Sequence, residues 1–302
     1  MPRTLVAAAL QSHHSWDEKD TVGRVLAMAE RAAHDGAQLI LPSELFAAPY
    51  FCKARNDAYF ELARPAAGHP LIAAFSKLAK ARAVVIPCSF YEKGEDGRYN
   101  SVAVIDADGS VLGIYRKTHI PDFTGYIETH YFKGGTQGAK VWATRWCRLG
   151  VGICWDQWFP ELARMMVLAG AEVLAYPTAI GSEPDHTEWD TVEQWQCAMR
   201  GHAASNQVPV VAANRTGRET DDGLTLDFYG SSFICDQRAH MVKVAPRHED
   251  AIVMAELDLD QARHDRTIWG TFQTRRPDIY GPLVETPAGR PPDALPGAGT
   301  GE

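Results

Sequence analysis

Several features that mark other classes of protein are missing from this sequence. No apolar run approaches the ~20 residues that a membrane-spanning helix needs. The cysteines, at positions 52, 88, 147, 154, 197 and 235, include no CxxC pair, which excludes an ordinary zinc or thioredoxin-like site. No secretory signal is recognisable, so we expect reduced thiols and a cytoplasmic protein.

Positive charge is also in short supply. The 302 residues carry 30 Lys and Arg against 38 Asp and Glu, a formal net charge of −8. This balance argues against nucleic acid or an anionic membrane as a partner and suits a cationic ligand, although acidity can also serve solubility alone. No Pro/Gly/Ser-rich linker interrupts residues 1–285, so we expect one domain there and a flexible Pro/Gly-rich tail over 286–302.

Short apolar strands alternate with amphipathic helices along the chain. Expected strands span residues 4–10, 39–41, 83–87, 100–106, 110–115, 172–176, 208–213, 228–235, 240–245 and 251–257. Expected helices span 17–33, 69–82, 162–169 and 188–205. In the last of these, an apolar stripe that includes Trp189 and Trp195 indicates core packing, and His202 is expected to be a structural histidine. This alternation predicts an α/β protein in which helices cover sheets.

Three chemically useful side chains stand at or near the ends of expected strands. They are Glu44, Lys117 and Cys154, and Cys154 lies at a strand-to-helix turn. Each has a simpler interpretation, as a solvated carboxylate, a strand-edge cation or a small buried thiol. Strand alternation nevertheless points Lys117 away from the face of Arg116, and functional groups gather at strand ends in α/β sheets.

Together these side chains suit nucleophilic catalysis. A thiol nucleophile needs a base, and a carboxylate such as Glu44, held in a dry pocket, can take its proton. The oxyanion that forms needs positive charge or N–H donors, which Lys117 and the backbone of Trp155 can supply. The sequence therefore predicts a pocket that combines all three groups.

The segments around these residues resemble those of the nitrilase superfamily of carbon–nitrogen hydrolases. The matching segments are residues 41–46 (LPSELF), 49–52 (PYFC), 115–122 (YRKTHIPD), 125–132 (GYIETHYF), 154–161 (CWDQWFPE), 179–184 (AIGSEP), 214–215 (NR) and 276–280 (RPDIY). They follow the family's order along most of the chain. Residues 123–124 (FT) stand where the family pattern has a smaller pair, and Ile127 and Thr129 beside Glu128 also depart from the pattern, so we expect a pocket shape particular to this chain.

The resemblance implies a nitrilase-like αββα sandwich, in which two-layer subunits pair into a four-layer homodimer or a higher homo-oligomer. Residues 276–283 would cross toward a partner subunit. The resemblance implies Cys154 as nucleophile, Glu44 as base and Lys117 as oxyanion stabiliser. It also implies that Glu128 orients the lysine, and that no metal or organic cofactor is needed. The alternative is a catalytically idle scaffold with the same fold, against which the intact catalytic set argues.

The stretch after Cys154 predicts the charge of the substrate. An enzyme for N-carbamoyl amino acids must hold a carboxylate, usually through arginine. Relatives that do so have basic residues soon after the nucleophile, whereas here no cation comes before Arg164. We therefore expect a small cationic N-carbamoyl substrate; the alternative is an N-carbamoyl amino-acid hydrolase or a ureidopropionase-like amidase.

Four residues are expected to bind this substrate. Aromatic rings and a carboxylate favour an ammonium tail, which assigns Tyr126, Trp155 and Asp156 to it. Glu183, in the loop after an expected strand, would pair with the far amine of a carbamoylated diamine. A solvated loop charge is the alternative for Glu183, and the favoured one for Asp185.

Overall fold

Alternate residues of the first strand, β1 (Thr4–Gln11), face two different hydrophobic cores. Leu5 and Ala7 pack in the larger core with residues of another sheet. Ala8 packs in a separate core with helix α1 (Glu18–His34). Because side chains of a strand alternate between its faces, β1 separates a helix layer from a second sheet layer.

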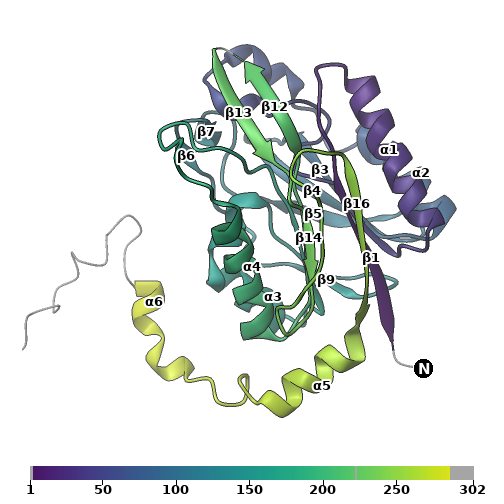
Figure 1. Ribbon diagram of the computed structural model, residues 1–302, viewed down its shortest axis with the longest axis vertical. Helices are drawn as coiled ribbons and strands as arrows, with labels where there is room; N and C mark the ends of the chain where they lie inside the picture. Colours follow the sequence, from purple (N-terminus) through teal and green to yellow (C-terminus); the bar gives the residue numbers. More distant parts are fainter. Residues whose placement is uncertain (1–2, 222, 286–302) are drawn as a thin grey trace, which may run out of the picture.

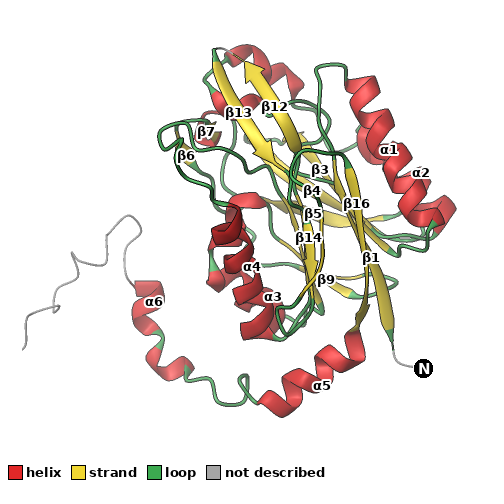
Figure 2. Ribbon diagram, in the orientation of Figure 1, coloured by secondary structure: helices red, strands yellow, loops and turns green. Residues whose placement is uncertain are grey.

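Two sheets make up the middle of the molecule (Figures 1 and 2). The structure is a computed structural model that describes residues 3–221 and 223–285. The first sheet contains, in spatial order, β16 (Ala251–Asp258), β1, β2 (Leu39–Leu41), β3 (Ile86–Lys93), β4 (Arg98–Ile105) and β5 (Val111–Arg116), with a single bridge joining β2 to the segment before β3. The second contains β15 (Met241–Val244), β14 (Phe233–Cys235), β11 (Val210–Ala213), β10 (Val173–Pro177), β9 (Arg148–Val151) and β8 (Val141–Ala143).

Helices cover the outer face of each sheet. Helices α1 and α2 (Pro70–Arg82) pack on the first sheet, and α3 (Pro160–Leu168) and α4 (Val192–Asn206) pack on the second. The expected αββα sandwich is therefore confirmed. All four layers belong to one chain, which corrects the expectation that a subunit contributes only two. The physical reason is that each sheet has two apolar faces, and the inner faces of the two sheets bury each other.

Most expected elements are present, and the differences have local causes. The helix expected over 188–205 begins only at Val192. The sequence pattern does not predict the hairpin of β12 (Thr216–Asp221) and most of β13 (Leu224–Tyr229). The reason is that β12 is mostly polar and lacks an apolar alternation. Small two-residue strands, β6 (Asp122–Phe123) and β7 (Tyr126–Ile127), shape the loop after Lys117.

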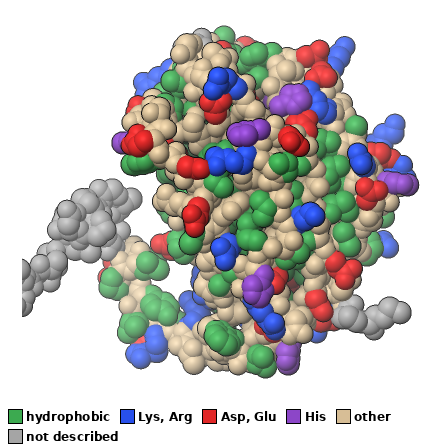
Figure 3. All heavy atoms as spheres, in the orientation of Figure 1, with side chains coloured by type: hydrophobic (Ala, Val, Ile, Leu, Met, Phe, Trp, Pro, Cys, Tyr) green, Lys and Arg blue, Asp and Glu red, His purple; other side chains and the backbone are tan. Residues whose placement is uncertain are grey.

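The C-terminal segment leaves the body as an arm. It contains α5 (Leu259–Trp269), η5 (Pro277–Ile279) and α6 (Gly281–Glu285), and it runs past α3 and α4 in Figure 1. Apolar side chains are visible on this arm in Figure 3, and Trp269 and Val284 are 73% and 83% exposed. The predicted tail over 286–302 lies outside the described residues. Within the described ranges, no helix has both the length and the apolar character needed to cross a bilayer.

Candidate active site

Cys154 begins the short helix η4 (Cys154–Trp158), which connects β9 to α3 as predicted. Its φ of 41° lies in the left-handed region, which is rare for a residue other than glycine. Such backbone conformations concentrate at functional sites, where the surrounding structure must enforce them. The buried thiol donates to the carbonyl oxygen of Ala179 at 3.6 Å.

The carboxylate of Asp156 holds this turn in place. Its Oδ2 accepts hydrogen bonds from the backbone N–H of Ile153 at 2.9 Å and the hydroxyl of Tyr115 at 2.7 Å. Its Oδ1 accepts from the backbone N–H of His119 at 3.0 Å. Asp156 is fully buried and does not line the cavity described below, so the predicted substrate contact is corrected. The turn itself requires the carboxylate, because its early N–H groups need an acceptor.

Glu44, Lys117 and Glu128 form one buried cluster beside this turn. The Nζ of Lys117 donates to Oε2 and Oε1 of Glu128 at 2.7 and 2.8 Å, and to Oε1 of Glu44 at 3.0 Å. Glu44 follows β2 and Lys117 follows β5, while Glu128 begins the short helix η3 (Glu128–His130). The structure thus brings together the four residues that were predicted to be catalytic.

Two further polar residues, not anticipated from the sequence, complete the cluster. The side-chain amide of Asn100 donates to Oε1 of Glu44 at 2.6 Å, and the hydroxyl of Tyr50 donates to Oε1 of Glu128 at 2.7 Å. Tyr50 lies inside a segment that matched the family, so a signal was present, whereas Asn100 has no such signal. Within the described chain, the other oxygen of Glu44, Oε2, has no hydrogen-bond partner. It is available to accept a proton.

Burial and mutual charge set the protonation of the cluster. Burial opposes the charge of Lys117, but Glu128 and Glu44 outweigh it and raise the lysine pKa well above its usual value. Burial raises the pKa of Glu128 to about 7, although Lys117 opposes this shift. Burial, with help from the charge of Glu44, also raises the pKa of the Cys154 thiol. The thiol is therefore protonated at neutral pH and needs a base in order to attack.

The thiol opens onto a cavity of about 420 Å³. The wall is largely aromatic and apolar, and it includes the residues 123–124 that depart from the family pattern. The lining residues are Pro121, Phe123, Thr124, Tyr126, Glu128, Cys154, Trp155, Trp158, Ala179, Ile180, Glu183, Pro184, Asp185, His186, Trp189, Thr191 and Gln194. In the part of the chain that is described, three carboxylate residues and neither lysine nor arginine line this cavity.

The residues 183–189 form the outer rim of the cavity. Glu183 is half-buried, and this burial raises the pKa of its carboxyl group. The ring of His186 stacks on Trp189, with centroids 3.8 Å apart and planes 7° from parallel. Trp189 was expected in the core but is 54% exposed, because the helix starts three residues later, at Val192. That expectation was wrong.

Of the other predicted substrate contacts, Tyr126 and Trp155 line the cavity with Glu183. The hydroxyl of Tyr126 accepts from the backbone N–H of Gly181 at 3.0 Å, which fixes it against the rim segment. His202 is structural, as expected, with its Nε2 2.7 Å from the carbonyl oxygen of Gln157.

The chain is similar to several known proteins. Residues 5–267 match the carbon–nitrogen hydrolase family. The chain is 48% identical over 281 residues to an N-carbamoylputrescine amidase of Oryza sativa subsp. japonica, with 92% of this chain and 93% of the relative covered. It is 45% identical over 277 residues to a citrullinase of Francisella tularensis subsp. tularensis, with 92% and 97% covered.

A solved structure has the same fold. The carbon–nitrogen hydrolase from Helicobacter pylori G27 superposes with a TM-score of 0.87 at 36% sequence identity. The match covers 94% of this chain and 99% of the other.

Proposed function

Because this chain belongs to the carbon–nitrogen hydrolase family, we propose that it cleaves N-carbamoylputrescine to putrescine, carbon dioxide and ammonia. The reaction would make it an enzyme of polyamine biosynthesis. One observation carries the choice of substrate: the charged side chains that line the cavity are carboxylates. Such a lining attracts the ammonium end of a carbamoylated diamine and repels a carboxylate.

The substrate lies along the cavity with its carbamoyl group at Cys154 and its amine at the rim. Tyr126 and Trp155 pack on the methylene chain, and their rings favour the cationic end. Glu183 pairs with the distal ammonium, since its half-buried carboxylate gains most from a cationic partner. Asp156 contributes indirectly, by holding the turn that carries Trp155.

The first half of the reaction forms a covalent intermediate. Sγ of Cys154 bonds to the carbamoyl carbon while its proton passes to Glu44. The negative oxygen that develops is stabilised by Lys117 and by the backbone N–H of Trp155. Glu44 then protonates the terminal nitrogen, the C–N bond breaks, and ammonia leaves. The putrescine part stays attached to the sulfur as a thiocarbamate.

The second half consumes water. Glu44 removes a proton from water as its oxygen attacks the same carbon, and the proton passes to the departing sulfur of Cys154. The released carbamate loses carbon dioxide and gives putrescine. Throughout, Glu128 keeps Lys117 oriented and charged.

Citrulline is the second candidate substrate, because one relative of similar identity is named a citrullinase. Citrulline has the same ureido group and carbon chain as N-carbamoylputrescine, with one carboxylate added beside the distal amine. The acidic rim disfavours that carboxylate. The N-carbamoyl amino acids, which the sequence left open as alternative substrates, also carry a carboxylate that the acidic rim disfavours.

A turnover comparison tests the proposal. N-carbamoylputrescine, citrulline and N-carbamoyl-β-alanine are assayed for ammonia release under the same conditions. We expect kcat/KM for N-carbamoylputrescine to exceed the other values by at least about tenfold. Equal or faster turnover of citrulline would replace the proposed substrate without changing the chemistry.

We further propose a cytoplasmic homo-oligomer. Support comes from the apolar residues exposed on the C-terminal arm, such as Trp269 and Val284, which a second subunit can cover. Light scattering at micromolar concentration should give at least a dimer mass, and a monomer would contradict the assembly.

A further inference from the structure

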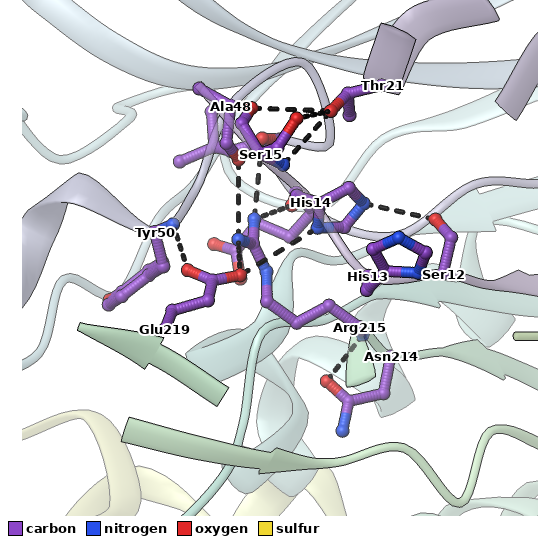
Figure 4. A network of polar contacts seen from close by, with 12 residues as sticks. Ser12, His13, His14, Ser15, Thr21, Ala48, Tyr50, Asn214, Arg215 and Glu219 are labelled. Atoms are coloured by element: carbon purple, nitrogen blue, oxygen red, sulfur yellow. Dashed lines mark hydrogen bonds and ion pairs between the residues drawn. The ribbon is translucent and has the colours of Figure 1, made fainter. Parts of the chain in front are cut away.

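A second buried polar network, which includes Arg215, Glu219 and Tyr50, is hydrogen-bonded to the catalytic cluster (Figure 4). Its centre is Arg215, which follows β11 and is fully buried. One guanidinium nitrogen, Nη2, donates to the backbone carbonyl oxygen of Glu44 at 2.7 Å and to that of Leu45 at 3.3 Å. Arg215 therefore holds the peptide that carries the proposed base.

The backbone at this point needs such support. Leu45 has a φ of 47°, in the left-handed region that a branched apolar residue seldom adopts. A turn of this kind leaves carbonyl groups without partners from a helix or sheet, and buried carbonyls require them. The planar guanidinium group donates to these carbonyls through Nη2 and to Glu219 through Nη1, a fixed two-ended geometry that lysine cannot supply.

Glu219, on β12, links Arg215 to the other catalytic carboxylate. Its Oε1 accepts from Nη1 of Arg215 at 2.9 Å, and its Oε2 accepts from the backbone N–H of Tyr50 at 2.5 Å. The hydroxyl of the same Tyr50 donates to Glu128. Lys53 and His14 also face Glu219, at 3.8 and 4.0 Å.

These contacts close a ring. From Lys117 the path runs through Glu128, Tyr50, Glu219 and Arg215 to the backbone of Glu44, whose side chain returns to Lys117. Glu44, Lys117 and Glu128 belong to the proposed chemistry. The other three members of the ring have no assigned chemical role and do not line the substrate cavity. A buried ion pair of this kind is weak support for stability, since its desolvation offsets its attraction.

We propose that Arg215 and Glu219 are positioning residues, which set the places of Glu44 and Glu128 relative to Lys117. This inference rests on the proposed function in one respect, namely that Glu44 is the base. The residues act through the backbone of Glu44 and through Tyr50, and they make no contact with the substrate. Their effect is therefore on kcat and on the reactivity of the thiol, not on substrate affinity.

The decisive variant is Glu219→Gln, which keeps the shape but places an amide donor opposite Arg215 or the N–H of Tyr50. We expect kcat to fall by about 10- to 100-fold, as misplacement of a catalytic group does, with KM within about twofold. The rate at which iodoacetamide alkylates Cys154 should fall in parallel, because Glu44 must take the thiol proton. Near-UV circular dichroism checks that the fold is retained.

The matched control is Asp227→Asn on the same hairpin. Asp227 forms an exposed two-point ion pair with Arg218, at 2.7 and 2.9 Å, and belongs to no part of the ring. This variant should keep kcat and alkylation within about twofold of the wild type.

Two results would overturn the inference. One is a folded Glu219→Gln protein with unchanged kcat and alkylation rate. The other is a Glu219→Gln protein that no longer folds, which would assign the ion pair to the fold alone. If the wild type does not hydrolyse N-carbamoylputrescine, the proposed function fails, but alkylation of Cys154 still tests the ring.

Discussion

The buried cluster and the rim of the cavity differ in how firmly they are held. Glu44, Lys117 and Glu128 are inaccessible to solvent, and their charges are paired at 2.7 to 3.0 Å. The rim at residues 183–189 is mostly exposed, and the rings of His186 and Trp189 stack on each other. The comparison predicts that bond cleavage and substrate choice reside in separable parts: changes to the cluster should act on kcat, and changes to the rim on KM.

Replacing Cys154 with Ala should have the largest effect, because it removes the proposed nucleophile. We expect turnover to fall by at least about 10⁴-fold, with substrate still bound at the rim. Mass spectrometry of wild-type enzyme mixed with substrate should show an adduct on the peptide that contains Cys154. Cys197→Ala, at an exposed cysteine, is the control and should be fully active. An adduct on Cys147 or Cys197 would refute the assignment.

Lowering the pH should break the ion pair between Glu128 and Lys117 without unfolding the protein. Burial raises the pKa of Glu128 to about 7, so below that pH the carboxyl group is protonated and its ion pair with Lys117 is lost. We expect kcat/KM to fall by about tenfold per pH unit below about 7. A raised pKa in the folded state means that this group stabilises the fold at low pH and loses that contribution as pH rises through about 7. Activity and this stability term therefore move in opposite directions, which a pH–rate profile and thermal unfolding at each pH would check. A flat profile would contradict the role of Glu128.

Neutralising the rim should change affinity and leave the chemistry intact. For Glu183→Gln we expect KM for N-carbamoylputrescine to rise about tenfold, since a partly buried charged hydrogen bond is lost. KM for a neutral alkylurea should change much less, and kcat should hold. Glu188→Gln is the control on the same loop, because that carboxylate is 70% exposed and does not line the cavity. An equal rise in KM for N-carbamoylputrescine and for the neutral alkylurea would show that Glu183 shapes the rim and does not recognise the charge of the substrate.

Replacing Trp189, the exposed aromatic residue of the rim, should have a smaller effect on KM. Trp189→Leu removes one face available to a cation, and we expect KM for the cationic substrate to rise about two- to fivefold. Trp16→Leu is a matched control, since Trp16 is 48% exposed against 54% for Trp189. An unchanged KM would remove Trp189 from the binding surface.

Chelation should have no effect. We propose that Lys117 fills the electrophilic role that a metal takes in other hydrolases, so dialysis against a chelator should leave the rate unchanged. Loss of activity that zinc restores would show that the cluster has been misinterpreted.

Local sequence was sufficient for the elements that carry the cluster. The apolar strand before Glu44 and the strand-to-helix turn at Cys154 are encoded by neighbouring residues, so they could be predicted. The rim could not, because the helical spacing of Trp189 continues a pattern whose helix begins only at Val192. There the backbone turns, supported by Asp190, whose Oδ1 accepts from the N–H of Val192 at 3.3 Å.

The sequence by itself therefore determined the α/β class and, through the family resemblance, the four side chains of Glu44, Lys117, Glu128 and Cys154. Only the tertiary structure decided that Asp156 serves the turn, that Trp189 faces the cavity, and that Arg215 reaches the backbone of Glu44. The physical reason is distance along the chain. Arg215 and Glu44 are 171 positions apart, and no local periodicity encodes such a pairing. It arises because two sheets, each stabilised by its own apolar faces, place their strand ends together and leave buried polar groups that must find partners there.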